Sequence, residues 1–567
     1  MTMLKLKTCS LAIAVALAFP AQAADDRQSL ELLRQTTMSL IDVLVDSGVL
    51  TRDKADSLVK QAEAKAMEKA AMAAPDPSRA ATVRVPYIPE SVRNDIRDQV
   101  KQEVLAQARN ERWAAPNSLP EWVSRIQWEG DVRVRYQSDM FASNNTPADY
   151  YAGLNMAAVG PDGRPSIAND SFPPFVTRNA AATETDAQGR ALGSLNEDQE
   201  RWRVRARLGL TAQVADTVSA GVRLATGNTN DRVSTNQTLG QNFNKYSFVV
   251  DRAFIRYTPV EWLTVSGGRI ANPWLSTDLI WDEDLNFEGV AATLRPSLDA
   301  GRVKPFVTAG WFPLRIDSPN EHGSRSMSAV QLGVDWEVRR DLRLKFGAAQ
   351  YRFDNVEGRE DSRFDELTGE RLPGYGQYEY GSGFRAKGNT LFTTNNLYET
   401  PSDFDSSNWI WGLASRFEPL ALTAAVDIAR FDPFHVMVSA EYVKNTAFDR
   451  KEIQRRTGVR LSDGSDTAYL FRVAVGMPSI RQIGDWQASF TYRRVGSDAV
   501  LDAFTDSDFG LGGTNMKGYT LGFSYGIEQN TAIGLRWMSA DSIDSPTLVA
   551  GDKFGVDTLQ MDLSVRF

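Results

Sequence analysis

The chain has 567 residues, of which 24% are charged, and its formal net charge at pH 7 is −9. This acidic balance argues against nucleic-acid binding, so we expect no nucleic-acid partner. No segment after the N-terminal region approaches about eighteen uninterrupted apolar residues, which excludes a helical membrane span. The mean hydropathy of −0.34 does not exclude a membrane barrel, because a barrel strand presents only every second residue to lipid.

Residues 1–23 have the pattern of a secretory signal peptide. Two lysines precede the apolar run Leu11–Phe19, and Ala21–Ala23 forms a small-residue cleavage site. We therefore expect the mature chain to begin at Ala24. The single cysteine, Cys9, would leave with this segment, so the mature chain would have no disulfide. That suits a bacterial envelope protein held together by other means.

Residues 24–120 are predicted to form a helical segment in the periplasm. Apolar residues in Leu30–Val45 recur at helical spacing, and Gly48 ends that helix. A later helix, Pro89–Arg112, has sparse apolar positions among charges, so it would be stable only when packed against something. Two interpretations are open for it: a coiled coil with neighbouring protomers, or a solvated helical spacer.

Residues 121–567 alternate between polar and apolar side chains in strand after strand. In Arg201–Gln213 the even-numbered residues are apolar. Four arginines fall on the opposite face: Arg201, Arg203, Arg205 and Arg207. A helix would scatter these arginines around its circumference, so the period of two indicates a strand.

Counting such segments predicts an all-β, up-and-down antiparallel transmembrane barrel of about 16 strands, within a range of roughly 14–18. The expected strands are Ile126–Tyr136, Arg201–Gln213, Val218–Leu224, Ala253–Tyr257, Leu263–Arg269, Phe287–Leu294, Val303–Trp311, Met327–Val338, Leu342–Phe353, Trp409–Phe417, Phe434–Val443, Ala468–Gly476, Trp486–Tyr492, Gly518–Ile527, Ala532–Trp537 and Val556–Phe567. A further short strand around Ala421–Asp432 is left open. The abundant tryptophan, tyrosine and phenylalanine fit aromatic girdles at two membrane interfaces.

Tight turns alternate with long polar loops along this region. The tight turns are Ala215–Asp216, Pro259–Glu261, Arg340–Asp341 and Glu528–Gln529, and the long loops are Met140–Glu200, Gly227–Asn244, Asn355–Asn408, Thr446–Asp466 and Gly496–Met516. This alternation is typical of a barrel with one rim in the periplasm and the other outside. The last strand must pair with the first, because hydrocarbon does not tolerate an open sheet edge. A barrel of about 16 strands is too wide for side chains to fill, so an aqueous channel results.

The last strand alternates and ends on Phe567, which resembles the C-terminal signature by which bacterial outer-membrane proteins are recognised for insertion. Phe567 is therefore the predicted membrane-insertion signal, and the barrel-assembly machinery is the predicted partner. The chain as a whole resembles the large putative porins of Gram-negative bacteria. The resemblance is carried by Leu44–Thr51, Ile88–Arg93, Val100–Arg109, Trp113–Asn117 and Gly130–Tyr136, and it covers nearly the whole mature chain. It implies a helical periplasmic segment before an outer-membrane barrel, and it names no solute.

If the apolar strand faces meet lipid, a set of arginines would line the pore. The candidates are Arg133, Arg135, Arg201, Arg203, Arg205, Arg207, Arg223, Arg252, Arg256 and Arg269. We favour the interpretation that they pair with nearby acids; the second hypothesis is that they favour anionic solutes. Carboxylates on loops such as Asp354–Glu370 would face them, and one of the two longest loops, Met140–Glu200 or Asn355–Asn408, is expected to fold inward as a constriction.

Catalysis is not expected. Of the two histidines, His322 lies in a predicted loop, and His435 opens a strand at the rim opposite to that of barrel hydrolases. Clusters of histidine and cysteine that could bind a metal are absent from the sequence, and Asp502–Asp508 lacks the spacing of a calcium loop. We therefore expect no enzyme, metal or cofactor.

The sequence thus predicts an outer-membrane porin for passive diffusion of small hydrophilic solutes, in contact with membrane lipid and lipopolysaccharide. General trimeric porins are similar in barrel architecture only, so a homotrimer is left open. The alternative function is a barrel-anchored adhesin or envelope-tethering protein. Single-channel conductance separates the two.

Overall fold

The computed structural model describes residues 125–146, 176–178, 198–229, 231–316, 324–360, 376–394, 410–458, 460–546 and 552–567. The predicted signal peptide and the predicted helical segment 24–120 lie outside these residues. The chain divides into Met1–Ala115 and Pro116–Phe567, and all described residues belong to the second unit. Among the described residues, no helix has both the length and the apolar character needed to cross a bilayer.

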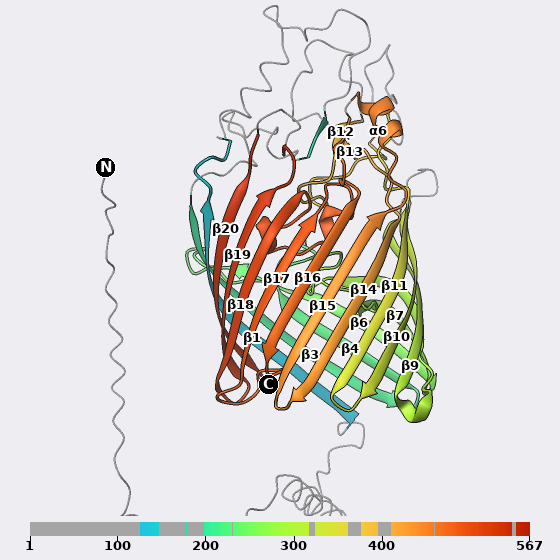
Figure 1. The fold of residues 1–567 in the computed structure, drawn as a ribbon, viewed down its shortest axis with the longest axis vertical. Helices are drawn as coiled ribbons and strands as arrows, with labels where there is room; N and C mark the ends of the chain where they lie inside the picture. Colours follow the sequence, from blue (N-terminus) through green and yellow to red (C-terminus); the bar gives the residue numbers. More distant parts are fainter. Residues whose placement is uncertain are drawn as a thin grey trace, which may run out of the picture. The chain divides into compact units, whose positions relative to one another are not determined.

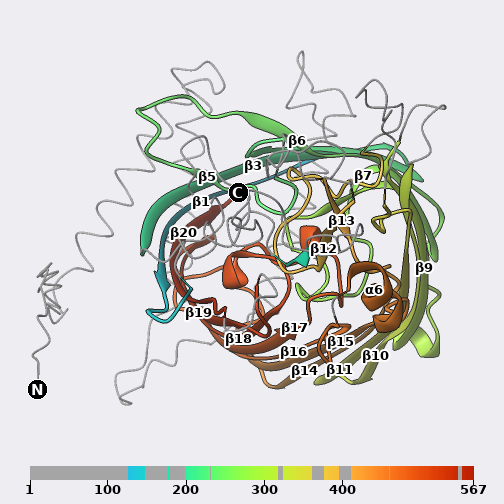
Figure 2. The ribbon, with the colours of Figure 1, turned by 90° about the horizontal axis from the view of Figure 1, so that it is seen from above.

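A closed antiparallel barrel makes up the described unit (Figures 1 and 2). Its sheet has 17 strands; without the two-residue β5 (Gln237–Thr238), 16 strands form the wall. They are β1 (Ile126–Phe141), β3 (Gln199–Ala215), β4 (Val218–Thr226), β6 (Phe248–Val260), β7 (Leu263–Ala271), β8 (Asn286–Leu294), β9 (Val303–Arg315), β10 (Arg325–Arg339), β11 (Leu342–Asp354), β14 (Pro419–Phe431), β15 (Phe434–Asn445), β16 (Thr467–Gly476), β17 (Trp486–Val495), β18 (Met516–Glu528), β19 (Thr531–Ser542) and β20 (Gly555–Arg566). The predicted up-and-down antiparallel barrel is confirmed.

The first and last strands close the ring. β1 pairs with β20 from Asp131 to Phe141 and with β3 on its other side. The seam ends in two backbone bonds: Gly130 N donates to Phe567 O at 2.9 Å, and Phe567 N donates to Gly130 O at 3.0 Å. A Cβ at position 130 would lie 2.3 Å from the Phe567 ring, so glycine makes room for the C-terminal aromatic. The role of Phe567 as an insertion signal stays a prediction.

Short connections lie at one end of the barrel and long loops at the other (Figure 1). The pairs β3–β4, β6–β7, β10–β11, β14–β15 and β18–β19 are each joined by two residues. The long loops include 227–247, 272–285 and 496–515, together with the longer segments after β1 and β11. The predicted alternation of tight turns and long loops is therefore present.

One predicted barrel strand was wrong. Trp409 lies outside the described residues, and Trp411–Leu413 forms β13, which pairs with β12 (Leu391–Thr393) in a small three-stranded sheet with β2 (Val176–Thr177). All three residues of β13 are buried, so the segment is a strand of the small sheet and not of the barrel wall. The wall strand is β14, which covers nearly all of the segment Ala421–Asp432 that the sequence left open as a further strand. Its run of alanine and leucine hides the alternation in the sequence.

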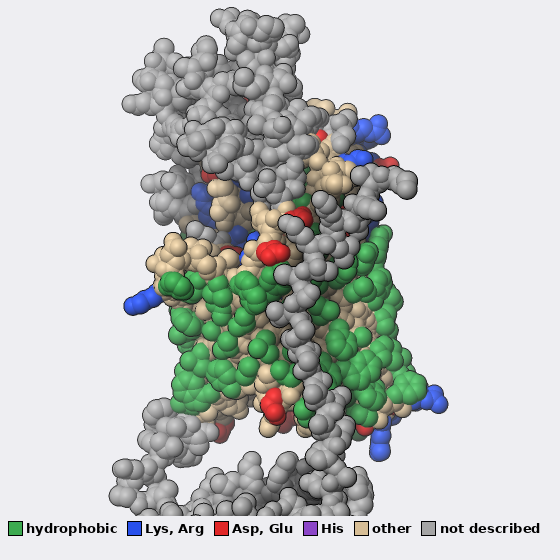
Figure 3. Space-filling model, turned by 90° about the vertical axis from the view of Figure 1, so that its left-hand side faces the viewer, with side chains coloured by type: hydrophobic (Ala, Val, Ile, Leu, Met, Phe, Trp, Pro, Cys, Tyr) green, Lys and Arg blue, Asp and Glu red, His purple; other side chains and the backbone are tan. Residues whose placement is uncertain are grey.

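Alternation leaves large apolar side chains exposed on the outer wall, where they form a continuous band (Figure 3). Exposed aromatic residues concentrate towards both ends of the strands. Near the short turns lie Trp128, Tyr257, Trp262, Trp336 and Tyr525, and near the long loops lie Trp202, Trp311, Tyr442, Tyr469, Tyr492 and Tyr519. Amphipathic rings favour membrane–water interfaces, so these two belts mark the borders of the lipid-facing band.

An apolar cluster fills part of the barrel interior. Loop residues contribute Trp274, Leu279, Ile280, Trp281, Leu501 and Phe504, and the inner wall contributes Phe287, Phe312, Met327, Tyr351, Phe353 and Leu470. The Trp281 ring lies at its centre, with centroid distances of 5.0 Å to Phe287, 5.2 Å to Tyr351 and 5.7 Å to Phe504. Burial of these rings is the force that holds the loops inside the ring.

A close approach between strands makes Gly333 on β10 sensitive to substitution. A Cβ there would lie 2.2 Å from Phe306 Cζ and 2.4 Å from the backbone oxygen of Phe346. We expect Gly333→Ala to destabilise the barrel by about 1–3 kcal/mol, because the backbone oxygen cannot yield as a side chain can. On a gel, folded and heat-unfolded barrels migrate differently. The temperature at which half of the protein has changed to the unfolded mobility should therefore fall.

The matched control is Gly534→Ala on β19, where the nearest atom to a new Cβ is 3.6 Å away. This variant should keep the wild-type midpoint or exceed it, since alanine loses less chain entropy on folding. Equal midpoints for the two variants would contradict the packing argument.

Candidate functional site

Three long loops turn into the barrel and bond to its inner wall (Figure 2). They are residues 272–285, 376–394 and 496–515. The first loop, between β7 and β8, reaches distant strands of the ring. Leu275 N donates to Gln331 Oε1 on β10 at 2.8 Å, and Thr277 N donates to Glu441 Oε2 on β15 at 3.1 Å. These bonds place the loop across the interior of the barrel.

The loop 496–515, between β17 and β18, supplies acids to inward-facing arginines. Asp508 Oδ2 accepts from Arg135 on β1 at 2.8 Å and from Arg536 on β19 at 2.6 Å. Asp506 Oδ2 accepts from Arg493 on β17 at 2.7 Å. The loop tip is therefore fixed by charge at three strands.

The loop 376–394 binds to the same body. Asn389 Nδ2 donates to the backbone oxygen of Ser497 at 2.6 Å, and the Tyr380 hydroxyl donates to Asp502 Oδ1 at 2.6 Å. Burial raises the pKa of Asp502 to about 6, although the hydrogen bond from Tyr380 opposes this shift. The three loops thus share hydrogen bonds and the apolar cluster, and they form one internal obstacle.

Arginines on β1 and β3 face each other across the strand pair. Arg133 lies directly opposite Arg205, and Arg135 lies directly opposite Arg203. Trp202, next to Arg203, is exposed on the outer apolar face, so the alternating arginines belong to the inner face. Like charges at opposed positions destabilise a sheet, so carboxylates must accompany them.

Seven of the ten predicted arginines form ion pairs within the described residues. The pairs are Arg133–Asp562, Arg135–Asp508, Arg135–Asp562, Arg201–Asp139, Arg205–Asp131, Arg205–Asp284, Arg207–Asp131, Arg207–Asp284, Arg223–Asp251 and Arg269–Glu288. Arg135 is the most buried, with 1% of its surface exposed, and it binds Asp562 through two bonds of 2.7 and 2.9 Å. Pairing therefore neutralises much of the arginine charge.

The other three predicted arginines have neutral partners and no carboxylate ion pair in the described part of the chain. Arg203 donates to Gln137 Oε1 at 3.5 Å, Arg252 donates to Asn286 Oδ1 at 2.7 Å, and the Arg256 guanidinium carbon lies 5.3 Å from the Phe254 ring centroid. These guanidinium groups form no direct ion pair there, although Asp508 and Asp231 attract Arg203, and Asp251 and Glu129 attract Arg252, at longer range.

Exposure of the inner face changes along the barrel. Arg256 and Arg472 have exposed side chains, whereas Arg135 at the level of the loops is almost completely buried. Water therefore reaches the inner wall away from the loops. Loop 496–515 meets the inner wall at Arg135 on β1.

Two carboxylates at the tip of loop 496–515 have opposite pKa shifts. Burial raises the pKa of Asp506 to about 6; Asp278 and Asp508 add to this shift, and Arg493 opposes it. Burial also acts to raise the pKa of Asp508, but Arg135 and the other arginines around it outweigh burial and hold the pKa well below its usual value. Asp506, like Asp502 in the same loop, therefore has a pKa of about 6.

A family model described as "Putative porin" matches residues 34–567. The chain belongs to the putative porin family. Solved structures with a similar fold include OmpF of Salmonella typhi in complex with daunomycin, with 9% identity, coverage of 78% of this chain and 97% of that chain, and a TM-score of 0.37. OprB of Pseudomonas putida at high pH has 9% identity, coverage of 79% and 96%, and a TM-score of 0.40. A loop L8 deletion mutant of OmpT, an outer membrane protein of Vibrio cholerae, has 8% identity, coverage of 78% and 100%, and a TM-score of 0.35.

None of the curated proteins searched matches this porin-family chain. The assignment rests on the family, since the structural likenesses are too weak to carry an argument about function.

Some predicted features of this porin lie outside the described residues. Most of the loop after β1 does so, and so do His322 and residues 361–370 of the segment Asp354–Glu370. Of the described part, Asp354 binds Arg352 at the end of β11. His435 lies at the start of β15, where its Nδ1 is 2.7 Å from Asp427 Oδ1.

The loop acids that do reach the arginines were not predicted. They are Asp278, Asp284, Asp506 and Asp508. A signal for them is present in the sequence: the loops around these acids contain Trp274, Trp281, Phe504 and Phe509, which a fully solvated loop would not favour. Apolar side chains inside a polar loop indicate that the loop packs against something.

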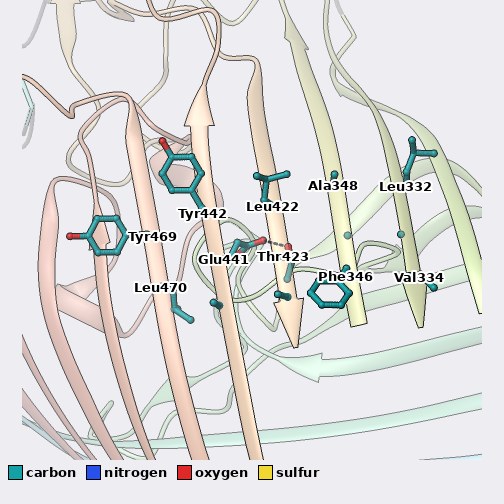
Figure 4. A pocket seen from close by; sticks show the side chains of 14 residues that line it. Leu332, Val334, Phe346, Ala348, Leu422, Thr423, Glu441, Tyr442, Tyr469 and Leu470 are labelled. Atoms are coloured by element: carbon teal, nitrogen blue, oxygen red, sulfur yellow. Dashed lines mark hydrogen bonds between the residues drawn. The ribbon is translucent and has the colours of Figure 1, made fainter. Parts of the chain in front are cut away.

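A separate hollow of about 720 Å³ lies along β10, β11, β14, β15 and β16 (Figure 4). Its exposed side chains include Leu332, Leu422 and Tyr442, which belong to the outer apolar band. Glu441 and Thr423 point toward one another, with a hydrogen bond of 2.9 Å, and both are buried. The apolar lining suits hydrocarbon chains, so we do not assign this hollow to the solute path.

Proposed function

We propose that this chain is an outer-membrane diffusion channel for small hydrophilic solutes, with a preference for anions. The observation that carries this proposal is the closed 16-strand wall, apolar outside and charged inside. A ring of this size is too wide for wall side chains to fill, so solute can pass beside the inserted loops. Membership of the porin family, and the fold, favour a channel over an enzyme.

The preference for anions rests on the arginines that lack a carboxylate partner. Arg203 and Arg252 lie on the inner face near the loops, with only neutral side-chain partners in the described residues. A lumen with low-dielectric walls focuses the field of such charges and raises the local concentration of anions.

The surroundings of the barrel stay predictions. We propose that the outer band contacts membrane lipid and lipopolysaccharide, that the barrel-assembly machinery reads Phe567, and that residues 24–120 lie in the periplasm. A homotrimer remains an open alternative to a monomer.

Swelling of proteoliposomes tests the proposed function. Three solutes of nearly equal size are suited: gluconate, glucose and glucosamine. We expect all three to enter, with gluconate fastest and glucosamine slowest. If correctly folded, heat-modifiable protein admits none of them, the channel is refuted and the adhesin or tethering function is favoured. If glucosamine is fastest, only the anion preference is refuted.

The selectivity should depend on pH through Asp506. Its pKa of about 6 means that lowering the pH from 7.5 to 5 removes a negative charge beside Arg493. The lumen then becomes more positive, so the chloride-to-potassium permeability ratio should rise as the pH falls through about 6. Reversal potentials in a salt gradient measure this ratio.

Asp506→Asn is the informative variant for this titration. It should show a higher ratio than the wild type at pH 7.5, and its rise near pH 6 should be smaller, because Asp502 still titrates there. Asp508 should remain ionised throughout, since its pKa is lowered. A ratio that falls on acidification would contradict the assignment.

A further inference from the structure

A cavity of about 140 Å³ lies inside the barrel between the inner wall and the inserted loops. Its lining includes Trp281, Phe287, Phe312, Phe384, Phe504 and Arg232. Phe287 and Phe312 come from the wall strands β8 and β9, and the other four come from four different loops. The cavity therefore exists only when these loops are assembled.

The cavity has the size and lining of a site for one aromatic ring. An apolar protein cavity of about 150 Å³ holds benzene, so about 140 Å³ is close to the space that a single ring requires. The ring centroids of Phe287 and Phe312 are 5.2 Å apart, and those of Phe384 and Phe504 are 5.5 Å apart. Edge-to-face aromatic contacts of this kind would also be available to a bound ring.

A guanidinium group with spare donors lines the same cavity. Arg232 donates to the backbone oxygens of Phe384 at 2.7 Å and Gly383 at 2.8 Å, and its guanidinium carbon lies 4.4 Å from the Phe384 ring centroid. Of its five N–H donors, three have no partner in the described residues, and it forms no ion pair there with a carboxylate. Its planar fork fits a carboxylate better than any neutral group does.

Among the described residues, no unpaired carboxylate lines the cavity, although Asp231 and Asp502, outside the lining, act electrostatically on Arg232. Glu288 lines it with a side chain that is 63% exposed, but this carboxylate is paired with Arg269. Asn286 uses its amide nitrogen on Asp251 and its oxygen on Arg252. Arg232 is therefore the charged group left to select the ligand.

We propose that this cavity binds single-ring aromatic carboxylates. The ring lies among the five aromatic side chains, and the carboxylate accepts hydrogen bonds from Arg232. This binding site does not depend on the proposed channel function, because it requires only the assembled loops. If the barrel conducts, the site holds such acids inside the barrel, against the inserted loops.

Titration calorimetry with benzoate tests the site on the full-length protein in detergent. Benzamide provides the same shape without charge, and acetate provides the charge without the ring. We expect benzoate to bind at least tenfold more tightly than either control. Equal binding of acetate and benzoate would indicate only the general attraction of lumenal arginines, and it would overturn the proposal. Absence of benzoate binding to heat-modifiable protein would also overturn it.

Two variants locate the binding. Arg232→Gln should weaken benzoate binding at least tenfold and leave the weaker benzamide binding unchanged. Leu314→Trp, on the cavity wall, should fill the space and abolish binding of both while Arg232 remains. Benzoate binding that survives both substitutions in folded protein would refute this site. If the wild-type protein binds benzoate but conducts no chloride, the channel is refuted and the binding site stands. The two failures are therefore distinguishable.

Discussion

Replacing Asp508 with asparagine is expected to loosen the loop 496–515 where it meets β1 and β19, and to raise the single-channel conductance. Asp508 is the shared partner of Arg135 and Arg536, and Arg135 has almost no exposed surface. Removing one partner of a buried ion pair leaves a charge without compensation and typically costs about 3–5 kcal/mol. Arg135 keeps Asp562, so we expect about 3 kcal/mol at most.

Two measurements check this expectation. The midpoint temperature of heat modification should fall, and planar-bilayer recordings should show a larger and noisier open current. Asp463→Asn is the matched control, because Asp463 pairs with Arg450 but its side chain is 95% exposed. Exposed ion pairs contribute about 1 kcal/mol or less, so this control should behave as wild type. Unchanged current and stability in Asp508→Asn would show that the loop is held by other contacts.

Reversing the charge of Arg203 is expected to have the largest effect on ion selectivity. Two unit charges about 8 Å apart in water interact by about 0.5 kcal/mol, so Arg203→Glu changes the energy of a passing anion by about 1 kcal/mol. That corresponds to about a fivefold lower anion permeability and a similar gain for cations. In the described residues, Arg203 bonds directly only to Gln137, so the substitution breaks no ion pair, although it removes a positive charge near Asp508 and Asp231.

Reversal potentials before and after substitution measure this effect. Arg455→Glu is the control; its side chain is 73% exposed on α6 (Arg450–Thr457), in the loop between β15 and β16. The control should retain the wild-type permeability ratio. If both variants shift the ratio equally, the selectivity comes from the mouth of the barrel and not from its inner wall.

The wall of the barrel was predictable because alternation is a local property of the sequence. The run from Arg201 to Gln213 shows its two faces directly, and the closing pair of β1 and β20 follows from the need to remove open edges. β14 was obscured since alanine is compatible with either face, and β13 was misassigned because its residues are buried on all sides.

The interior was less predictable because it depends on contacts between distant segments. Nothing near Asp508 in the sequence indicates Arg135, which is 373 positions away. Which arginines are paired depends on strand register and on loop placement, so the sequence could name the arginines but not separate Arg203 from Arg135. The aromatic residues inside the polar loops were the available clue.

The central claim is that this barrel conducts and that its inner wall attracts anions. Single-channel recording of the full-length protein in a planar bilayer, with a potassium chloride gradient across it, tests both parts at once. We predict discrete open-channel steps and a reversal potential that has the same sign as the equilibrium potential of chloride. A folded, inserted barrel that gives no steps would contradict the channel, and a potential set by potassium would contradict the anion preference.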